Sequence, residues 1–144
     1  MVDQNREEEL ARVAQALNES PFYRYIGMRI TKIGEGFSEV YIKLTPEFKN
    51  IWGTIHGGVA ASLLDTTCGS SLYSELEQNE GAVTIDLRVN FIAVGKVGEM
   101  IGKGQFVYRT RTLAWSQADA FDGQGNLVAR AQAIHKVIKR EWAR

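Results

Sequence analysis

The run of residues from Val59 to Leu76 constrains the fold of this 144-residue chain more than any other stretch. Its apolar residues recur at helical spacing on nearly every side, and a helix of this kind is usually buried inside a domain. A glycine pair, Gly57 and Gly58, opens the run, and one carboxylate, Asp65, interrupts it. We therefore expect a long central helix that the rest of the chain surrounds.

The chain on either side of this helix is predicted to form strands. Residues 82–92 alternate apolar and polar side chains, which is the pattern of a strand with one buried face. Further strand-like segments lie at residues 28–33, 37–44, 99–109, 112–121 and 127–138. Consecutive hairpins around one buried helix predict an α+β fold, with an antiparallel sheet of five to six strands wrapped around the helix.

The N-terminal region is predicted to add one helix to a single domain. Residues 1–20 carry apolar side chains at the i, i+3, i+4 and i+7 spacing of an amphipathic helix, and residues 21–144 form the domain itself. An aromatic cluster, Phe22, Tyr23 and Tyr25, follows the helix. We expect it to pack on the domain as a short turn or helix, although aromatic residues ahead of a binding loop could also touch a ligand.

Composition narrows the classes of function. No apolar run reaches the roughly 20 residues that cross a bilayer, and the N-terminus lacks the basic and apolar regions of a signal peptide. We therefore expect a cytoplasmic protein with no membrane contact. The single cysteine, Cys68, excludes an internal disulfide. The two histidines, His56 and His135, form no cluster at metal-ligand spacing with it, so no metal site is expected.

Charge is distributed unevenly along the chain. Residues 1–81 hold 7 Lys/Arg and 12 Asp/Glu, whereas residues 82–144 hold 10 Lys/Arg and 5 Asp/Glu. Two differently charged solvated faces would explain this difference, and so would later strands that present cations to an anionic ligand. Because no dense Lys/Arg run with interleaved aromatic residues occurs, nucleic acid is not an expected partner.

The start of the central helix and Asp65 are the candidate catalytic elements. The first N–H groups of a helix lack internal acceptors and carry a partial positive charge, and the glycines at 57 and 58 let a ligand approach them. Such donors suit an oxygen that gains negative charge, such as the carbonyl of a thioester under attack. Alternatively, the glycines only permit a tight turn or close packing. Asp65 is either a base in a cleft or an exposed helix carboxylate.

Helix geometry separates these two elements. Asp65 follows Gly57 by about two turns, or roughly 12 Å along the axis at about 1.5 Å per residue. One chain cannot easily bring both to the same small group. If the two act together, a second subunit contributes one half of the site, and the chain is expected to be a homo-oligomer.

Other candidate residues have structural as well as functional interpretations. Asn50 and His56 can be turn or capping residues ahead of the helix. Thr84 can be an ordinary strand residue or a hydrogen-bond donor to a water or to Asp65. Cys68 has no base beside it in the sequence and is not expected to be a nucleophile. Four aromatic residues can belong either to the core or to a pocket: Phe48, Trp52, Tyr73 and Phe91.

The combination of these residues resembles a known family. Asn50, Gly53 and His56-Gly57-Gly58, followed by Leu63-Leu64-Asp65, are similar to the motif of hot-dog-fold acyl-CoA thioesterases of the phenylacetate-degradation (PaaI-like) branch. The similarity covers roughly residues 25–138. It implies a hot-dog fold, an acyl-CoA substrate, and a dimer with one continuous sheet that often pairs into a tetramer. It implies no cofactor, because CoA is part of the substrate.

The same resemblance implies roles for individual residues. Asp65 would be the nucleophile or the general base that activates water, and the Gly57 N–H would polarise the thioester carbonyl. Asn50 would help place water or substrate, His56 would support the loop, and Thr84 would orient the water. In such enzymes the half of the site with Asn50 and Gly57 in one subunit faces the Asp65 half of the other.

The resemblance also implies that CoA enters along the dimer interface, with its phosphates near basic residues. The positions that match the family's nucleotide-contacting segment are Arg109, Arg111, Thr112 and Leu113. Further candidates for substrate or CoA contacts are Gly58, Arg88, Lys96, His135 and Lys136. The four aromatic residues named above are the candidates for the acyl pocket.

Three functions are open on these grounds. The first is an acyl-CoA thioesterase, in which water attacks the thioester and releases a carboxylate and free CoA. The second is a non-catalytic module of the same fold that binds or senses acyl-CoA. The third is a hot-dog hydratase or dehydratase, whose sites usually pair a catalytic histidine and an acid around an enoyl group.

Overall fold

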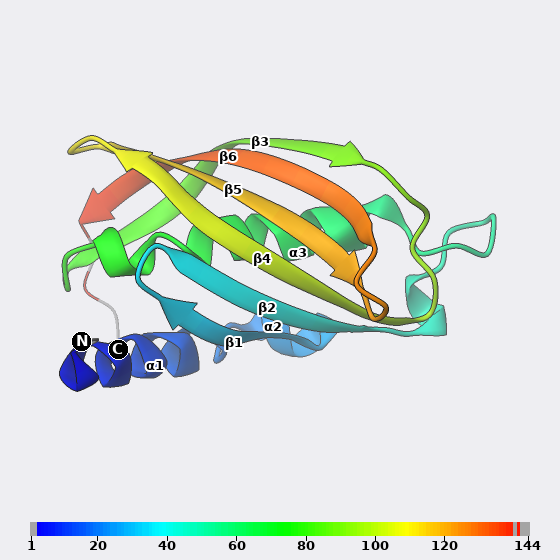
Figure 1. Ribbon diagram of the computed structural model, residues 1–144, viewed down its shortest axis with the longest axis horizontal. Helices are drawn as coiled ribbons and strands as arrows, with labels where there is room; N and C mark the ends of the chain where they lie inside the picture. Colours follow the sequence, from blue (N-terminus) through cyan, green and yellow to red (C-terminus); the bar gives the residue numbers. More distant parts are fainter. Residues whose placement is uncertain (1–2, 140, 142–144) are drawn as a thin grey trace.

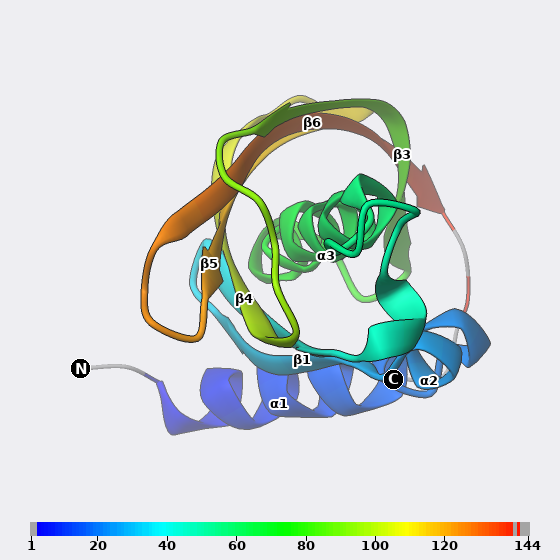
Figure 2. The same cartoon turned by 90° about the vertical axis from the view of Figure 1, so that its right-hand side faces the viewer.

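The computed structural model describes residues 3–139 and 141, and its central feature is a curled antiparallel sheet that encloses one long helix (Figures 1 and 2). Within these residues, six strands pair in the order β1-β2-β4-β5-β6-β3, so that β1 and β3 are the edges. The strands are β1 (Met28–Gly34), β2 (Phe37–Leu44), β3 (Glu80–Phe91), β4 (Gly98–Arg109), β5 (Leu113–Asp122) and β6 (Leu127–Lys139). The helices are α1 (Gln4–Leu17), α2 (Pro21–Ile26) and α3 (Gly57–Ser70), with 3-10 turns η1 (Pro46–Phe48) and η2 (Tyr73–Glu75). The predicted α+β architecture is confirmed.

The central helix α3 is shorter than the predicted run. It ends at Ser70, and the chain before Leu76 forms η2 instead of a continued α-helix. The hydroxyls of Ser70 and Ser71 donate hydrogen bonds to the carbonyls of Thr67 (3.3 Å) and Cys68 (2.7 Å). Serine hydroxyls that bond back to the helix compete with its regular hydrogen bonds, and this explains the early end.

Helix α3 lies close against strand β4, and at Gly104 the strand meets the helix backbone directly. A Cβ atom added at Gly104 would overlap the carbonyl oxygen of Thr67, and one added at Gly102 would overlap the Thr67 hydroxyl. The same carbonyl accepts a hydrogen bond of 2.7 Å from the Ser38 hydroxyl on β2. The two glycines therefore allow a close approach that fixes the depth of α3 inside the sheet.

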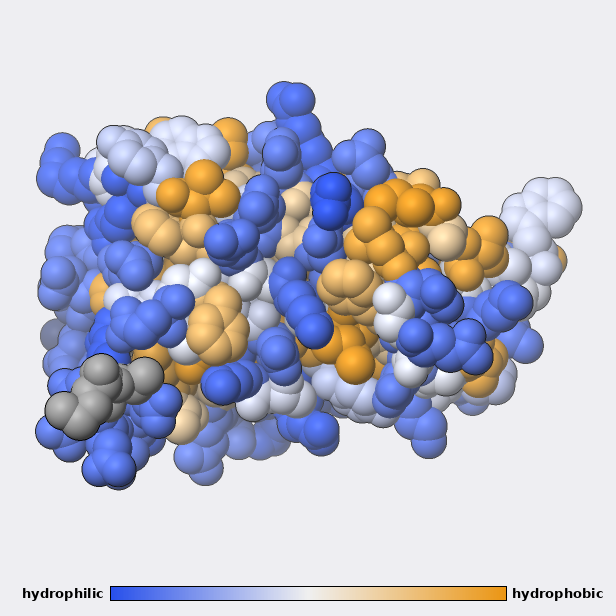
Figure 3. All heavy atoms as spheres, viewed as in Figure 1, coloured by the Kyte–Doolittle hydropathy of each residue, from blue (hydrophilic) through white to orange (hydrophobic). Residues whose placement is uncertain are grey.

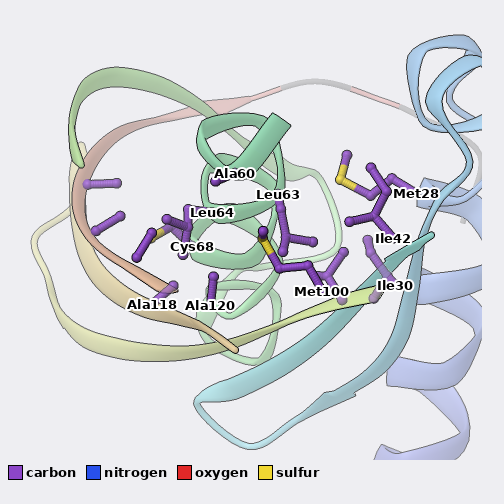
Figure 4. Close-up of a cluster of buried hydrophobic side chains, with 14 of the residues drawn as sticks. Met28, Ile30, Ile42, Ala60, Leu63, Leu64, Cys68, Met100, Ala118 and Ala120 are labelled. Atoms are coloured by element: carbon purple, nitrogen blue, oxygen red, sulfur yellow. The ribbon is translucent and has the colours of Figure 1, made fainter. Parts of the chain in front are cut away.

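The hydrophobic core forms on both sides of α3 (Figure 4). Leu63 points toward Met100, whereas Leu64 and Cys68 point toward the opposite part of the sheet, near Ala118. All five side chains are buried. Strands β5 and β6 present mainly alanines to the helix: Ala114, Ala118, Ala120, Ala129, Ala131 and Ala133. Because these side chains are small, the sheet can curl closely around α3.

Edge strand β3 contains a bulge that decides which of its residues face α3. Its pairing with β6 slips between Thr84 and Asp86, so that Ile85 is the extra residue. A bulge shifts the alternation of side chains by one position. Thr84 and Phe91, which are seven residues apart, therefore both face the helix. The regular alternation predicted for residues 82–92 would have put them on opposite faces and is wrong at this point.

The predicted N-terminal helix is present as α1, which lies along β1 (Figure 2). The Asp3 side chain caps its start by accepting a hydrogen bond of 3.0 Å from the Asn5 N–H. Residues 1 and 2 of the predicted range lie outside the described residues, and the division into residues 1–20 and 21–144 stays a prediction. No helix in the described part of the chain is long and apolar enough to span a membrane.

The free edge of β1 is closed at one point by a side chain. At the end of α1, the Asn18 amide donates to the Ile30 carbonyl at 2.9 Å and accepts from the Ile30 N–H at 2.8 Å. A side-chain amide thus takes the place of a neighbouring strand here. The contact also fastens the junction between α1 and α2 to the sheet.

We expect Gly104→Ala to lower the free energy of unfolding by about 1–3 kcal/mol, because the new Cβ meets a backbone carbonyl that cannot move without α3. Gly81→Ala is the matched control. Gly81 is also a buried glycine of the sheet, but a Cβ there would lie 3.8 Å from Ile138 Cγ1, which is ordinary contact. Denaturant unfolding measures both variants, and equal stabilities would contradict the close-packing interpretation.

Candidate active site

Asp65 lies on the wall of a cavity of about 230 Å³ between α3, the β3 edge and the N-terminal helices. Helix α3 supplies Ser62, Asp65, Thr66, Gly69 and Ser70, and η2 supplies Tyr73. The strands supply Ala82, Thr84 and His135, and the N-terminal helices supply Leu17, Phe22 and Tyr23. The small residues around Asp65 on α3 leave this space open. Asp65 is half-buried, so it is not a fully exposed helix carboxylate.

The Asp65 carboxylate is oriented by Thr84. The Thr84 hydroxyl donates a hydrogen bond of 2.7 Å to Asp65 Oδ1 and so joins β3 to α3. Oδ2 accepts no hydrogen bond from any residue that the structure describes. The contact between the two side chains that the sequence analysis considered is confirmed, while their catalytic roles stay a prediction. The Ile85 bulge makes the contact possible, because it turns Thr84 toward the helix.

His135 lines the same cavity as Asp65. Its side chain is 1% exposed, and neither ring nitrogen has a hydrogen-bond partner among the described residues. Burial lowers the pKa of the imidazole, and the Asp65 carboxylate opposes this with a smaller upward shift. A neutral imidazole offers one donor and one acceptor to a polar atom in the cavity. His135 faces α3 opposite Thr84, and its predicted contact with the substrate or CoA stays a prediction.

A second cavity, of about 240 Å³, lies at the start of α3. His56 caps the helix there, since its Nδ1 accepts a hydrogen bond of 2.8 Å from the Gly58 N–H. The Gly58 N–H, which was predicted as a substrate contact, therefore already has an acceptor within the chain. The Gly57 N–H donates to no acceptor in the described chain and is the free donor of this helix start. A Cβ at Gly57 would lie only 3.0 Å from the Phe91 ring, which explains the glycine.

Asn50 lines the second cavity and folds the loop that leads to it. Its Oδ1 accepts hydrogen bonds from the N–H groups of Trp52 (2.9 Å) and Thr54 (3.2 Å), and its Nδ2 donates to the Thr54 hydroxyl at 2.9 Å. Gly53, at φ 79°, allows the tight turn between them. The amide thus holds the loop in shape just before Gly57.

The two cavities have no lining residue in common. On strand β3, Thr84 lines the first and Phe91 the second, and seven extended residues span about 23 Å at about 3.3 Å each. One chain therefore does not bring Asp65 and Gly57 to the same small group, as the helix geometry predicted. Each chain therefore presents Asp65 and Gly57 in two separate cavities.

The predicted acyl-pocket residues are divided among four places. Tyr73 lines the Asp65 cavity, and Phe91 lines the Gly57 cavity. Phe48 packs partly buried against the hydrophobic core. Trp52 is 81% exposed on the loop before α3 and lines neither cavity, so the structure does not support an acyl contact for it in this chain.

The guanidinium of Arg109, a predicted CoA contact, binds other groups of the same chain. Its guanidinium forms an ion pair of 3.0 Å with Glu80, whose side chain is 5% exposed, and also donates to the Glu75 carbonyl at 2.6 Å. Lys139 pairs with the same carboxylate at 3.2 Å. Hydrogen bonds from Arg109 are the largest cause that lowers the pKa of Glu80 to about 2. We therefore assign Arg109 a structural role at the base of the β4–β5 turn.

The other predicted CoA contacts lie at or near the surface without forming one cluster. Arg111 and Thr112 lie exposed in the β4–β5 turn, and the half-buried Leu113 pairs across the ladder with Lys136. The others are Arg88 on β3 and Lys96 in the loop after β3, both exposed. Their contacts with CoA stay predictions.

Two further observations concern Cys68 and possible metal ligands. Burial is the main cause that raises the pKa of the Cys68 thiol to about 12, so this side chain is an inert part of the core. Within the described residues, no group of three or more His, Cys, Asp or Glu side chains could hold a metal ion. The aromatic residues Phe22 and Tyr23, for which a ligand contact was one of two interpretations, line the cavity together with Leu17, which the sequence did not indicate; all three reach Asp65 only through the tertiary fold.

Comparison with known families gives a match over just over half of the chain. Residues 53–129 match the family model of the thioesterase superfamily. The chain is 24% identical over 127 residues to acyl-coenzyme A thioesterase 13 of Homo sapiens, an overlap that covers 85% of this chain and 90% of that protein. It is 26% identical over 132 residues to the medium/long-chain acyl-CoA thioesterase YigI of Escherichia coli, covering 81% of this chain and 85% of the relative.

Solved structures confirm the predicted hot-dog fold. The Escherichia coli PaaI protein from the phenylacetic acid degradation operon has a TM-score of 0.83 at 20% identity, covering 93% of this chain and 96% of its own. A thioesterase from Haemophilus influenzae has a TM-score of 0.81 at 21% identity, with 90% of each chain covered. At these identities the likeness concerns the fold alone.

We expect Arg109→Ala to lower the free energy of unfolding at neutral pH by about 1–3 kcal/mol, because it removes a main partner of the buried Glu80 carboxylate. Arg111→Ala, two residues away and exposed, is the matched control, with a change within about 0.5 kcal/mol.

A carboxylate whose pKa is lowered on folding stabilises the protein above its unfolded pKa and loses this contribution as pH falls toward 2. Unfolding at pH 7, 4.5 and 3 should therefore show a smaller acid-induced loss in Arg109→Ala than in the wild type. An equal loss would contradict the assignment.

Proposed function

Because the chain belongs to the thioesterase superfamily and is a hydrolase of thioester bonds, we propose that it hydrolyses acyl-CoA at a site that two subunits share. The names of the relatives, which are acyl-CoA thioesterases, support the substrate class. The observation that carries the proposed site is the hydrogen bond from Thr84 to Asp65 on a cavity wall. The free N–H at Gly57 supplies the second half.

The proposed chemistry uses these two halves in one step. Asp65, oriented by Thr84, either takes a proton from an attacking water or attacks the carbonyl carbon itself. The Gly57 N–H donates to the oxygen that becomes negative. In both cases a carbon–oxygen bond forms, the carbon–sulfur bond breaks, and the CoA thiolate leaves and takes up a proton. If Asp65 is the nucleophile, water then hydrolyses the acyl–Asp65 anhydride, which releases the carboxylate product and restores Asp65. Asn50 and His56 hold the loop and the helix start, so that the donor is in place before the substrate arrives.

The geometry of β3 supplies a way to join the halves. Thr84 donates a hydrogen bond to Asp65, and Phe91 lies beside Gly57, so each proposed half-site contains one residue of this edge strand. Antiparallel pairing of β3 with its copy, about a two-fold axis near residues 87 and 88, places Thr84 beside the partner subunit's Phe91. Asp65 then faces the partner subunit's Gly57. The proposed assembly is a dimer with a continuous sheet, and a tetramer would be a pair of such dimers.

The surface of β3 supports this pairing. The strand is 12 residues long and forms an edge, and its apolar side chains Val83, Ile85 and Phe91 are 45%, 57% and 60% exposed. Apolar atoms also gather where β3 runs into the following loop (Figure 3). A long apolar edge of this kind invites pairing with another strand.

We expect Asp65→Asn to reduce turnover of acyl-CoA by about 10²–10⁴-fold, because the amide accepts the Thr84 hydrogen bond but cannot act as base or nucleophile. Release of free thiol across a panel of acyl-CoA esters measures this. The controls are an unchanged melting temperature and unchanged binding of free CoA. Undiminished turnover in Asp65→Asn would contradict the proposed role of Asp65 as base or nucleophile.

Two additions to this assay separate the remaining alternatives. In single-turnover hydrolysis in ¹⁸O water, the label enters Asp65 and not the product if Asp65 is the nucleophile and water opens the resulting anhydride at the aspartyl carbonyl. The label enters only the product if Asp65 is the base. Because His135 and Asp65 line one cavity, a crotonyl thioester tests hydration. Water addition without thiol release would favour the hydratase alternative.

We expect two inactive variants to restore activity together. Asp65→Asn removes one half-site, and Asn50→Ala removes the amide that folds the other. A mixed dimer keeps one complete site, so co-expression in equal amounts should give about one quarter of wild-type activity. If the whole site lay within one chain, the mixture would be no more active than the sum of the two variants.

A further inference from the structure

The N-terminal helices form one wall of the Asp65 cavity, although they lie outside the matched residues 53–129. Leu17 comes from the end of α1, and Phe22 and Tyr23 come from α2. Figure 2 shows α2 below α3, on the side where the sheet edges β1 and β3 are not joined to each other. The wall therefore belongs to a part of this chain outside its family match.

We propose that this wall sets the length of the acyl chain that the enzyme accepts, with Tyr23 and Phe22 as the specificity-determining residues and short acyl chains as the preferred substrates. The inference rests on the proposed acyl-CoA hydrolysis at Asp65 and adds the part of the substrate that the site selects.

The lining of the two cavities decides which one receives the acyl group. The Asp65 cavity includes the buried residues Thr66, Ser70 and His135, so it reaches into the protein. The Gly57 cavity is bounded on one side by the exposed Phe91 and Val94 and continues into the exposed loop after β3. Because CoA is large and must extend into solvent, we place the CoA part of the substrate at the Gly57 cavity, on the side of the exposed loop after β3. The acyl group is then directed into the Asp65 cavity.

Tyr23 is the inner residue of the wall. Burial is the main cause that raises the pKa of its phenol; Thr66, the neighbour of Asp65 in sequence, opposes this shift, and the Asp65 charge adds to it. Phe22 is 51% exposed and marks the outer end of the wall. An acyl chain that extends from Asp65 toward α2 meets the Tyr23 ring first.

The wall is fastened to the fold and cannot easily yield to a longer chain. The Asn18 amide binds both backbone groups of Ile30 between α1 and α2. At the other end of α1, the Arg6 guanidinium donates to the Ser74 carbonyl and to Glu9. Helix α1 is thus tied at both ends, and the Asn18 contact also holds the start of α2, so the wall is expected to select substrates by size.

Volume and polarity both favour a short chain. At about 30 Å³ for each water-sized group, the cavity of about 230 Å³ holds on the order of eight such groups. Many of the groups around this space are polar, including the Tyr23 phenol, the Thr66 hydroxyl and the His135 ring. A long hydrocarbon chain would both exceed the space and cover polar groups without bonding to them.

The test is the ratio of kcat/KM for decanoyl-CoA to that for butanoyl-CoA. The wild type should prefer butanoyl-CoA, and Tyr23→Ala should raise the ratio by about fourfold for each methylene newly accommodated. Phe22→Ala, at a half-exposed side chain that the fold tolerates, should raise it by a smaller factor. Tyr25→Ala on the same helix is the matched control, because Tyr25 is 89% exposed and lines no part of the cavity.

Each result decides the question. A wild type that prefers decanoyl-CoA, or a ratio unchanged in both Tyr23→Ala and Phe22→Ala, overturns the inference. If Tyr23→Ala does not fold, Phe22→Ala alone decides. Failure of the proposed function looks different: the wild type would then release no thiol from any acyl-CoA, or Asp65→Asn would stay active.

Discussion

The contact between the backbones of α3 and β4 fixes the position of the candidate catalytic carboxylate. Gly102 and Gly104 leave no side chain between β4 and Thr67, and Asp65 lies two residues before Thr67 on the same helix. Its distance from Thr84 therefore depends on backbone packing and not on side chains that can repack. Catalytic groups need positions held within about 0.5 Å, and a buried backbone contact supplies such precision.

Strand β3 carries the second constraint, because it serves both the site and the sheet edge. The Ile85 bulge turns Thr84 and Phe91 to the same face, so that one strand touches both half-sites. Without the bulge, one of the two would point away from α3. An irregularity of one residue thus links the geometry of the proposed active site to the geometry of the proposed dimer.

Local patterns in the sequence predicted the elements and offered the contact between Thr84 and Asp65 as one possibility, but not most other contacts between distant residues. Helical spacing identified α3, and alternation identified the strands, because both patterns reflect burial of one face. The glycine start of α3 and the separation of Asp65 from Gly57 followed from helix geometry alone. The bulge at Ile85 has no glycine or proline to mark it, and the pairing of Arg109 with Glu80 and of Tyr23 with the Asp65 cavity joins residues at least 29 positions apart. Such contacts depend on the assembled fold.

The Asn18 amide on β1 has a consequence for how the protein can associate. A sheet with two open edges can add strands at both ends, and copies of it can polymerise without limit. Here a side chain already binds the backbone of Ile30, and α1 covers much of the same edge. Growth of the sheet is thereby directed to the opposite edge, where the proposed two-fold pairing would use up the edges of both copies. Asn18 thus acts as a terminator that favours a finite assembly over a fibre.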